Sequence, residues 1–312
     1  MGALLLLGGF GLLALPGLTV GLGRRLPPDE WARLCRGALV AGGVIVEVGS
    51  VLYALPTVLR AAGVPAFAAM CERTLRLFLP GTPAAGWAAG AAAVSIATLS
   101  GMGRIRARRG CRAARAEPWL GEHRRFGAHE VVTLPTDRIL AVSVAGAPAQ
   151  ILISRGLVET LSGEQLELVL SHEVAHLDLN HERTLHLAAA LDHGFAFFWP
   201  LRRSTQALRT ALERWADEVA AGKLPGRRSV LHSALLGVTG VAVGTELAAF
   251  SPAHTVVERL RALEQPSPRP SSVARGLLYL PGMVAVGTTL VAMAAWSSQA
   301  WMLVSMAGRC PL

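Results

Sequence analysis

The chain has 312 residues, of which 52% are hydrophobic and only 16% are charged, and its mean hydropathy is +0.43. This composition is too apolar for an ordinary soluble domain and predicts segments that cross a membrane. The 30 basic residues outnumber the 21 acidic ones, giving a formal net charge of +9. Such an excess suits a nucleic acid or a membrane surface. The four cysteines have no close pairs, which excludes a disulfide scaffold and a cysteine-rich zinc module.

Four apolar runs predict membrane helices. They cover residues 2–22, 37–59, 84–102 and 277–303. Each run is long enough to cross a bilayer. No basic residue precedes the first run, whereas Arg24 and Arg25 follow it. A cleaved leader would carry its basic residues first, so we expect a retained helix with its N-terminus outside the cell membrane. Four spans then place the C-terminus outside as well.

An arginine-rich tract follows the third apolar run, with six arginines within residues 104–115. Its position matches the positive-inside rule and predicts contact with lipid headgroups on the cytoplasmic side. No nucleic-acid-binding fold or interleaved aromatic residues accompany it, so we expect no direct binding to nucleic acid. The same topology leaves Cys71 and Cys310 outside, and a disulfide between them is a hypothesis.

The domain organisation follows from these runs. Residues 1–116 hold the first three membrane helices and the basic tract, and residues 269–312 hold a linker and the fourth helix. We expect residues 117–268 to form a cytoplasmic α+β domain inserted between the third and fourth helices. Within it, the apolar run 231–250 is interrupted by polar positions, and we expect a buried helix there. The predicted fold class is a mainly α membrane protein with four transmembrane helices and one inserted α+β domain.

Local patterns predict the elements of this domain. Short segments at residues 131–134, 139–144 and 149–154 are typical of strands, the last two forming a hairpin. Ser162 followed by Gln165 forms a capping box, which predicts one helix over residues 162–181.

The predicted helix contains the pentapeptide His172-Glu173-Val174-Ala175-His176. Residues at i and i+4 share one helix face, so both histidines are able to bind the same metal ion. Glu173 lies beside that face, where its carboxylate is placed to take a proton from the attacking water. The pattern is the His-Glu-x-x-His signature of zinc metallopeptidases.

A catalytic zinc ion is usually held by three protein ligands, so a third ligand must come from elsewhere. The next helical pattern carries Glu213 and Asp217, which again lie at i and i+4. We predict that Glu213 completes the metal site. We predict that Asp217 accepts the free ring N–H of a ligating histidine and so fixes its orientation.

This combination resembles the gluzincin metallopeptidases, and the layout resembles the bacterial BlaR/MecR-type membrane peptidases. The specific part of the resemblance is residues 150–220, including the segments 151–157 and 161–165. It implies one Zn²⁺ per chain and cleavage of a protein or peptide substrate, such as a transcriptional repressor or a membrane protein, at the lipid bilayer. The receptors of that type carry a penicillin-binding sensor domain after the last span, where this chain has only a few residues, so β-lactam sensing is not carried over.

A more distant resemblance is to HtpX-type and CAAX-type membrane peptidases, which share the ligand set but arrange their spans differently. His181 lies where relatives carry a histidine after an aspartate, although here Asn180 precedes it. His181 and His254 are weak candidates for an oxyanion donor. A substrate strand is expected to pair with an edge strand such as residues 149–154.

Two further functions stay open beside a zinc-dependent endopeptidase of regulatory or membrane proteins. One is a membrane quality-control or CAAX-type peptidase. The other is a non-catalytic membrane signalling scaffold whose zinc site is structural. A structural site is usually closed by four protein ligands and has no need of Glu173.

Overall fold

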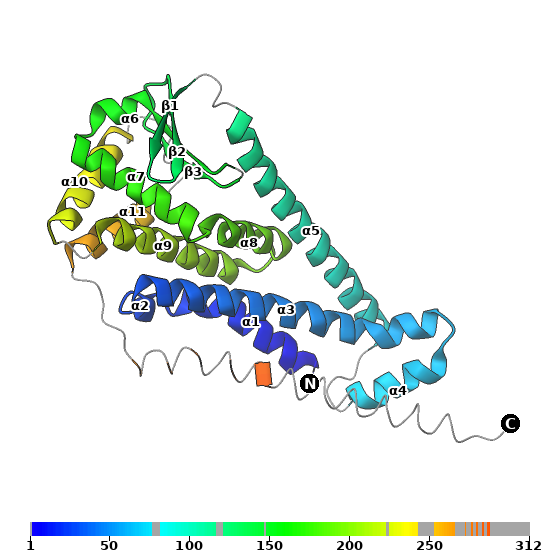
Figure 1. The fold of residues 1–312 in the computed structure, drawn as a ribbon. Helices are drawn as coiled ribbons and strands as arrows, with labels where there is room; N and C mark the ends of the chain where they lie inside the picture. Colours follow the sequence, from blue (N-terminus) through cyan, green and yellow to red (C-terminus); the bar gives the residue numbers. More distant parts are fainter. Residues whose placement is uncertain are drawn as a thin grey trace.

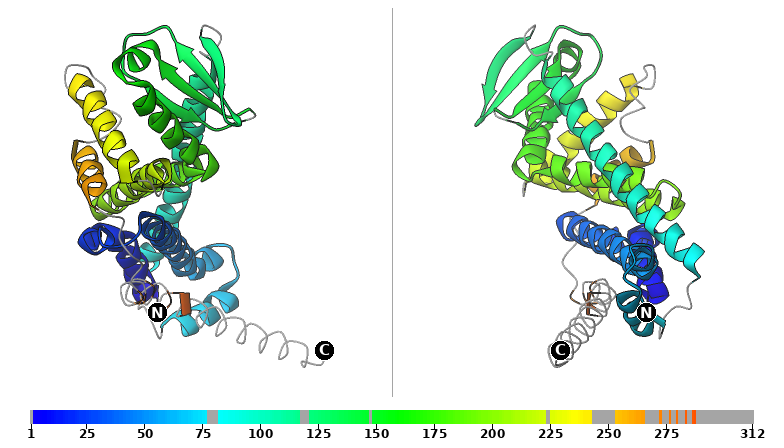
Figure 2. Two further views of the ribbon diagram at one scale, coloured as in Figure 1. Left: turned by 60° about the vertical axis from the view of Figure 1, so that its left-hand side comes forward. Right: turned by 90° about the vertical axis from the view of Figure 1, so that its right-hand side faces the viewer.

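The computed structural model describes residues 2–76, 82–116, 121–146, 148–222, 225–242 and 253–265, with positions 272, 276, 279, 283, 286 and 287. It is mainly helical with one small mixed sheet. Figures 1 and 2 show the sheet at one end and the N-terminal helices at the other, with α9 between them. The helix α5 runs along one side and links the two ends.

The described residues among 2–116 form five helices. They are α1 (Gly2–Leu18), α2 (Val20–Gly23), α3 (Pro28–Ala61), α4 (Pro65–Arg76) and α5 (Pro83–Ala116). Pro28 starts α3 at a position where its missing N–H costs no hydrogen bond. The arginine-rich tract is not a separate segment, because it forms the end of α5. Its arginines 104, 106, 108 and 109 are exposed to solvent.

Among the described residues, two helical stretches are long and apolar enough to cross a membrane, namely Pro28–Ala61 and Pro83–Gly110. They contain the second and third predicted spans. The first predicted span is a shorter apolar helix that ends at Leu18. Most of the fourth predicted span, residues 277–303, lies outside the described residues, as does Cys310. The four-span topology and the Cys71–Cys310 disulfide therefore stay predictions.

Two glycines let α1 and α3 pack backbone to backbone. A Cβ atom at Gly42 would lie 2.8 Å from the carbonyl oxygen of Gly9 and 2.9 Å from the backbone nitrogen of Leu13. A Cβ atom at Gly9 would lie 2.7 Å from a methyl group of Val46. Small residues permit this close approach of helices.

The sheet contains one strand more than the sequence predicts. Its strands are β1 (Glu122–Phe126), β2 (His129–Leu134), β3 (Ala141–Val144) and β4 (Gln150–Ser154), in the spatial order β1-β2-β4-β3. The predicted hairpin is confirmed as the antiparallel pair β3–β4. The strand β4 also pairs in parallel with β2. It is therefore interior, and the prediction that it forms an edge was wrong.

In the part of the chain that the structure describes, six helices follow the sheet. They are α6 (Arg155–Thr160), α7 (Gly163–Asp178), α8 (His181–Gly194), α9 (Trp199–Ala221), α10 (Pro225–Ala242) and α11 (Ala253–Glu264). The capping box at Ser162 is confirmed. The single helix predicted over residues 162–181 was wrong, because Asn180 adopts a left-handed conformation with φ 54° and starts a second helix. The end of the predicted helix 231–250 lies outside the described residues.

Two apolar cores flank the middle of the molecule. One lies between the sheet and helices α7 and α10, with Ile151, Ile153 and Leu157 fully buried. The other joins α1 and α3 to α8 and α9, with Leu13, Leu39 and Leu208 at its centre. The helix α9 therefore contacts both α7 and the N-terminal helices.

Candidate metal centre

Two histidines on α7 face the same point. The capping box at Ser162 fixes the start of this helix, and ten residues later the helix carries His172 into the interior, where it is 6% exposed. His176 lies one turn further along. The Nε2 atoms of the two rings are 3.1 Å apart, as expected when i and i+4 side chains converge on one ligand.

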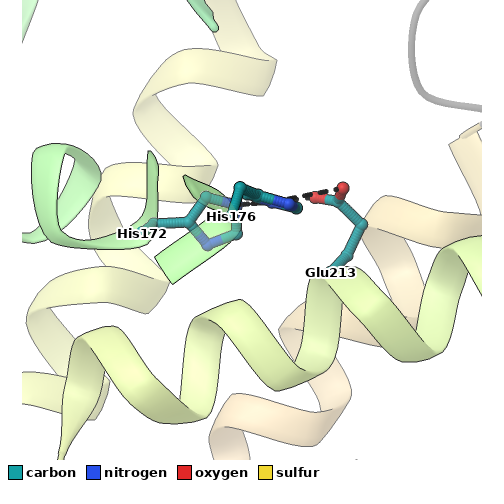
Figure 3. Close-up of side chains that lie close together, drawn as sticks. All are labelled: His172, His176 and Glu213. Carbon is teal, nitrogen blue, oxygen red and sulfur yellow. Dashed lines mark hydrogen bonds and ion pairs between the residues drawn. The ribbon is translucent and has the colours of Figure 1, made fainter. Parts of the chain in front are cut away.

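A carboxylate from α9 completes the cluster. One oxygen of Glu213 lies 3.5 Å from Nε2 of His172 and the other lies 3.6 Å from Nε2 of His176. Figure 3 shows the two imidazoles and the carboxylate pointing toward one another from their two helices. These three residues form a group with the donor atoms and spacing of a metal site.

The donor set fits zinc. Zn–N and Zn–O bonds of about 2.0–2.1 Å in a tetrahedron place neighbouring donor atoms roughly 3.3–3.4 Å apart. The three separations at this site are 3.1, 3.5 and 3.6 Å. Within the described residues the group has three members, which leaves a fourth coordination position for water or substrate. The residues His172, His176 and Glu213 would hold the ion.

The predicted partner of the first histidine is also in place. Asp217 is 2% exposed, and one of its oxygens lies 3.0 Å from Nδ1 of His172. Such carboxylates orient a ligating ring and increase its basicity. The structure thus brings together the three predicted metal ligands and the predicted partner Asp217.

Arg259 of α11 is a member of the site that the sequence did not predict. It donates to Asp217 through Nε at 2.8 Å and Nη2 at 2.7 Å, and its Nη1 lies 3.1 Å from Glu213. The side chain is 11% exposed. One guanidinium therefore pairs with two acidic side chains and orients both. No local pattern marks it, because an arginine on an amphipathic helix is usually solvated.

The charges of the metal-free site are strongly coupled. Burial opposes ionisation of Asp217, but Arg259 and His172 outweigh it and lower the pKa of Asp217 to about 2. The pKa of Glu213 is lowered by the same neighbours against the same burial. Burial and Arg259 disfavour protonation of His172, yet hydrogen bonds to Asp217 and Glu213 raise its pKa to about 9. Burial lowers the pKa of His176 to about 4.

Glu173 lies next to His172 on α7 and contacts the sheet. It is 9% exposed and is hydrogen-bonded by Ser143 of β3. Burial, with the nearby charge of Glu213, raises the pKa of its carboxyl group above the usual range, although His172 opposes this. A carboxyl group with a raised pKa is suited to accept and return a proton near neutral pH.

His181 at the start of α8 also belongs to the cluster. Its Nδ1 lies 3.0 Å from Nδ1 of His176, and its side chain is almost fully buried at 1% exposure. Burial lowers the pKa of its ring to about 3. The side chain of His254 lies outside the described part of the structure.

The geometry agrees with a comparison to known protein families. The model of Peptidase family M48 matches residues 141–207. The match supports a zinc metallopeptidase family and indicates a metallopeptidase hydrolase. It spans β3, β4 and the whole of α7, and therefore includes His172, Glu173 and His176, whereas Glu213 lies six residues beyond its end. Among curated proteins and solved structures, no match to the chain was found.

Proposed function

We propose that the chain is a membrane-bound, zinc-dependent endopeptidase that cleaves regulatory or membrane proteins. The observation that carries the proposal is the convergence of His172, His176 and Glu213, with Glu173 buried beside them. The group has three members within the described residues, which favours a catalytic site over a closed structural one. The resemblance to BlaR/MecR-type peptidases stays a prediction.

The chain's own residues supply the proton transfers. A zinc ion held by the three ligands would polarise the scissile carbonyl and increase the acidity of the attacking water. Glu173 accepts the proton of that water and then donates it to the leaving amine. Ser143 fixes the Glu173 carboxyl group from β3. Asp217 holds the ring of His172, and Arg259 holds Glu213.

The substrate strand is proposed to pair with β3. One side of this strand is paired with β4, and its other side is the edge of the sheet. An extended peptide is able to add to such an edge through backbone hydrogen bonds. Because Ser143 of β3 contacts Glu173, a peptide paired there would run beside the proton-transferring carboxyl group.

The membrane location rests on the N-terminal helices. Both α3 and α5 expose large apolar side chains, including Val44 and Val51 on α3 and Val94 and Leu99 on α5. The arginines at the end of α5 suit lipid headgroups of the cytoplasmic surface. We propose that the site lies on the cytoplasmic side, and that the N- and C-termini lie outside.

The test compares membrane proteomes of cells that produce the wild type or the Glu173→Gln variant. The variant keeps all three metal ligands, so its zinc content should stay at one per chain while cleavage falls by at least roughly 10²-fold. Substrates then accumulate as intact proteins. Glu164→Gln, on the same helix but exposed, is the matched control. Normal cleavage by the Glu173→Gln variant would refute the mechanism.

A further inference from the structure

The second ligating histidine has a partner that is itself a histidine. Nδ1 of His181 lies 3.0 Å from Nδ1 of His176, and the ring planes meet edge to face at 81°. His172 has Asp217 in the equivalent place. The two ligands from α7 are thus each contacted on the Nδ1 side, one by a carboxylate and the other by an imidazole.

The chemistry of this contact fixes both rings. When Nε2 of His176 binds a metal ion, its lone pair is used there and its proton resides on Nδ1. That N–H must donate to His181, whose Nδ1 must then be the acceptor. The proton of His181 is therefore on Nε2, a buried atom for which the described residues supply no hydrogen-bond partner.

The backbone places His181 against His176 by an unusual break. In a continuous helix, side chains five residues apart point about 140° away from each other, since successive residues turn by about 100°. Asn180 interrupts the helix in the left-handed region, at φ 54° and ψ 40°. Asparagine tolerates this conformation better than most residues. The chain then starts α8 with His181 directed back toward the end of α7.

The far side of His181 is held by α9. The ring of Trp215 lies 5.2 Å from the imidazole, centroid to centroid. Trp215 packs against the buried core that α1 and α3 share with α8 and α9, and the guanidinium of Arg33 on α3 lies 5.3 Å from its ring. These contacts restrict the rotation of the His181 ring.

We propose that His181 is a positioning residue that orients His176 for metal binding by accepting a hydrogen bond from its Nδ1. The role is distinct from the oxyanion donor considered from the sequence, because the Nδ1 atom faces the ligand. The inference rests on the proposed function of the site as a zinc centre.

Metal affinity and metal spectroscopy test this role without any substrate. The full chain is purified in detergent, stripped of metal and titrated with Co²⁺, whose visible absorption reports the geometry of its ligands. The variants are His181→Leu, which removes the acceptor, His181→Asn, whose Oδ1 occupies the place of Nδ1, and His181→Gln, whose amide reaches only the place of Nε2. The control is His186→Leu, on the same helix.

Loss of an outer partner of a metal ligand typically weakens binding by about 10–100-fold. We expect that loss and an altered Co²⁺ spectrum for His181→Leu and His181→Gln, and recovery of most of the affinity for His181→Asn. A His181→Leu variant with the affinity and the spectrum of the wild type would overturn this inference but not the proposed function of the site. If that variant does not fold, equal affinities of the Asn and Gln variants overturn it. A wild-type chain that binds neither Co²⁺ nor Zn²⁺ overturns the proposed function as well.

Discussion

Arg259 grips Asp217 in a two-pronged pair, with Nε on one carboxylate oxygen and Nη2 on the other, at 2.8 and 2.7 Å. The pair joins α11 to α9 across 42 residues of sequence. Planar, two-pronged contacts of this kind are specific to arginine. The same guanidinium reaches Glu213, so α11 directly contacts a proposed metal ligand.

Replacing Arg259 with glutamine is expected to destabilise the metal-free protein by about 3–5 kcal/mol, since two largely buried carboxylates lose their counter-charge. The free energy of unfolding in detergent, with a chelator present, measures this. Arg259→Lys should recover only part of the loss. Arg261→Gln, at an exposed position of the same helix, should stay within about 0.5 kcal/mol of the wild type. A loss of less than about 0.5 kcal/mol in Arg259→Gln would contradict the prediction.

The pH dependence of the metal-free protein should reveal the same pair. Asp217 has a pKa of about 2 in the folded state, below its ordinary value of 3.8. Between these two pKa values the unfolded chain therefore binds more protons than the folded chain. The contribution of the pair to the free energy of unfolding is complete above about pH 4 and is lost as the pH falls through about 2. The contribution is about 2–3 kcal/mol. Acid unfolding curves of wild type and Asp217→Asn should converge near pH 2; curves separated by a constant amount would contradict this.

The close contact of α1 and α3 predicts a large effect from one methyl group. In Gly42→Ala, the new Cβ would meet backbone atoms of Gly9 and Leu13 within 3 Å, and backbone cannot move aside as a flexible side chain does. We expect a loss of about 1–3 kcal/mol. Gly37→Ala, on the same helix with nothing within 4 Å, should be neutral or stabilising. Thermal unfolding of the two variants in one detergent compares them, and equal melting temperatures would refute the packing argument.

Asn180 gives a matched pair of backbone variants. Glycine adopts its left-handed conformation freely, whereas alanine pays roughly 1–2 kcal/mol for it. Asn180→Gly should therefore be close to wild type in stability, and Asn180→Ala should be lower by about 1 kcal/mol. Chemical denaturation measures the difference. An alanine variant as stable as the glycine variant would show that α7 and α8 join in another way.

How far the sequence predicts this structure depends on the range of the interaction. The capping box at Ser162 and the pairing of His172 with His176 are local, because helical spacing alone determines them. Glu213 is predicted because a catalytic zinc ion usually takes a third protein ligand, and Glu213 and Asp217 lie at i and i+4 of the next helical pattern. These parts of the site follow from short segments and from known coordination chemistry.

The parts that the sequence missed depend on contacts between distant segments. The interior position of β4 results from its parallel pairing with β2, which no local pattern indicates. The helix α3 begins at Pro28, nine residues before the predicted apolar run, and its first turns bury Trp31 and Cys35 in the core shared with α1, α8 and α9. Arg259 reaches the site because α11 packs beside α9, and no local pattern indicates that contact. A left-handed residue at Asn180 is likewise invisible to helical periodicity.

The helix α9 has two faces with two different tasks. One face presents Glu213 and Asp217 to the metal site, and the other packs on α1 and α3, where Ser204 accepts a hydrogen bond from the backbone of Gly17 at 2.9 Å. If metal binding fixes α9 and so stabilises the packing of α1 and α3 on it, that packing strengthens metal binding by the same coupling free energy, because thermodynamic coupling is reciprocal. The occupancy of the candidate metal site and the packing of the N-terminal helices are therefore linked, so a change at either one is expected to alter the other.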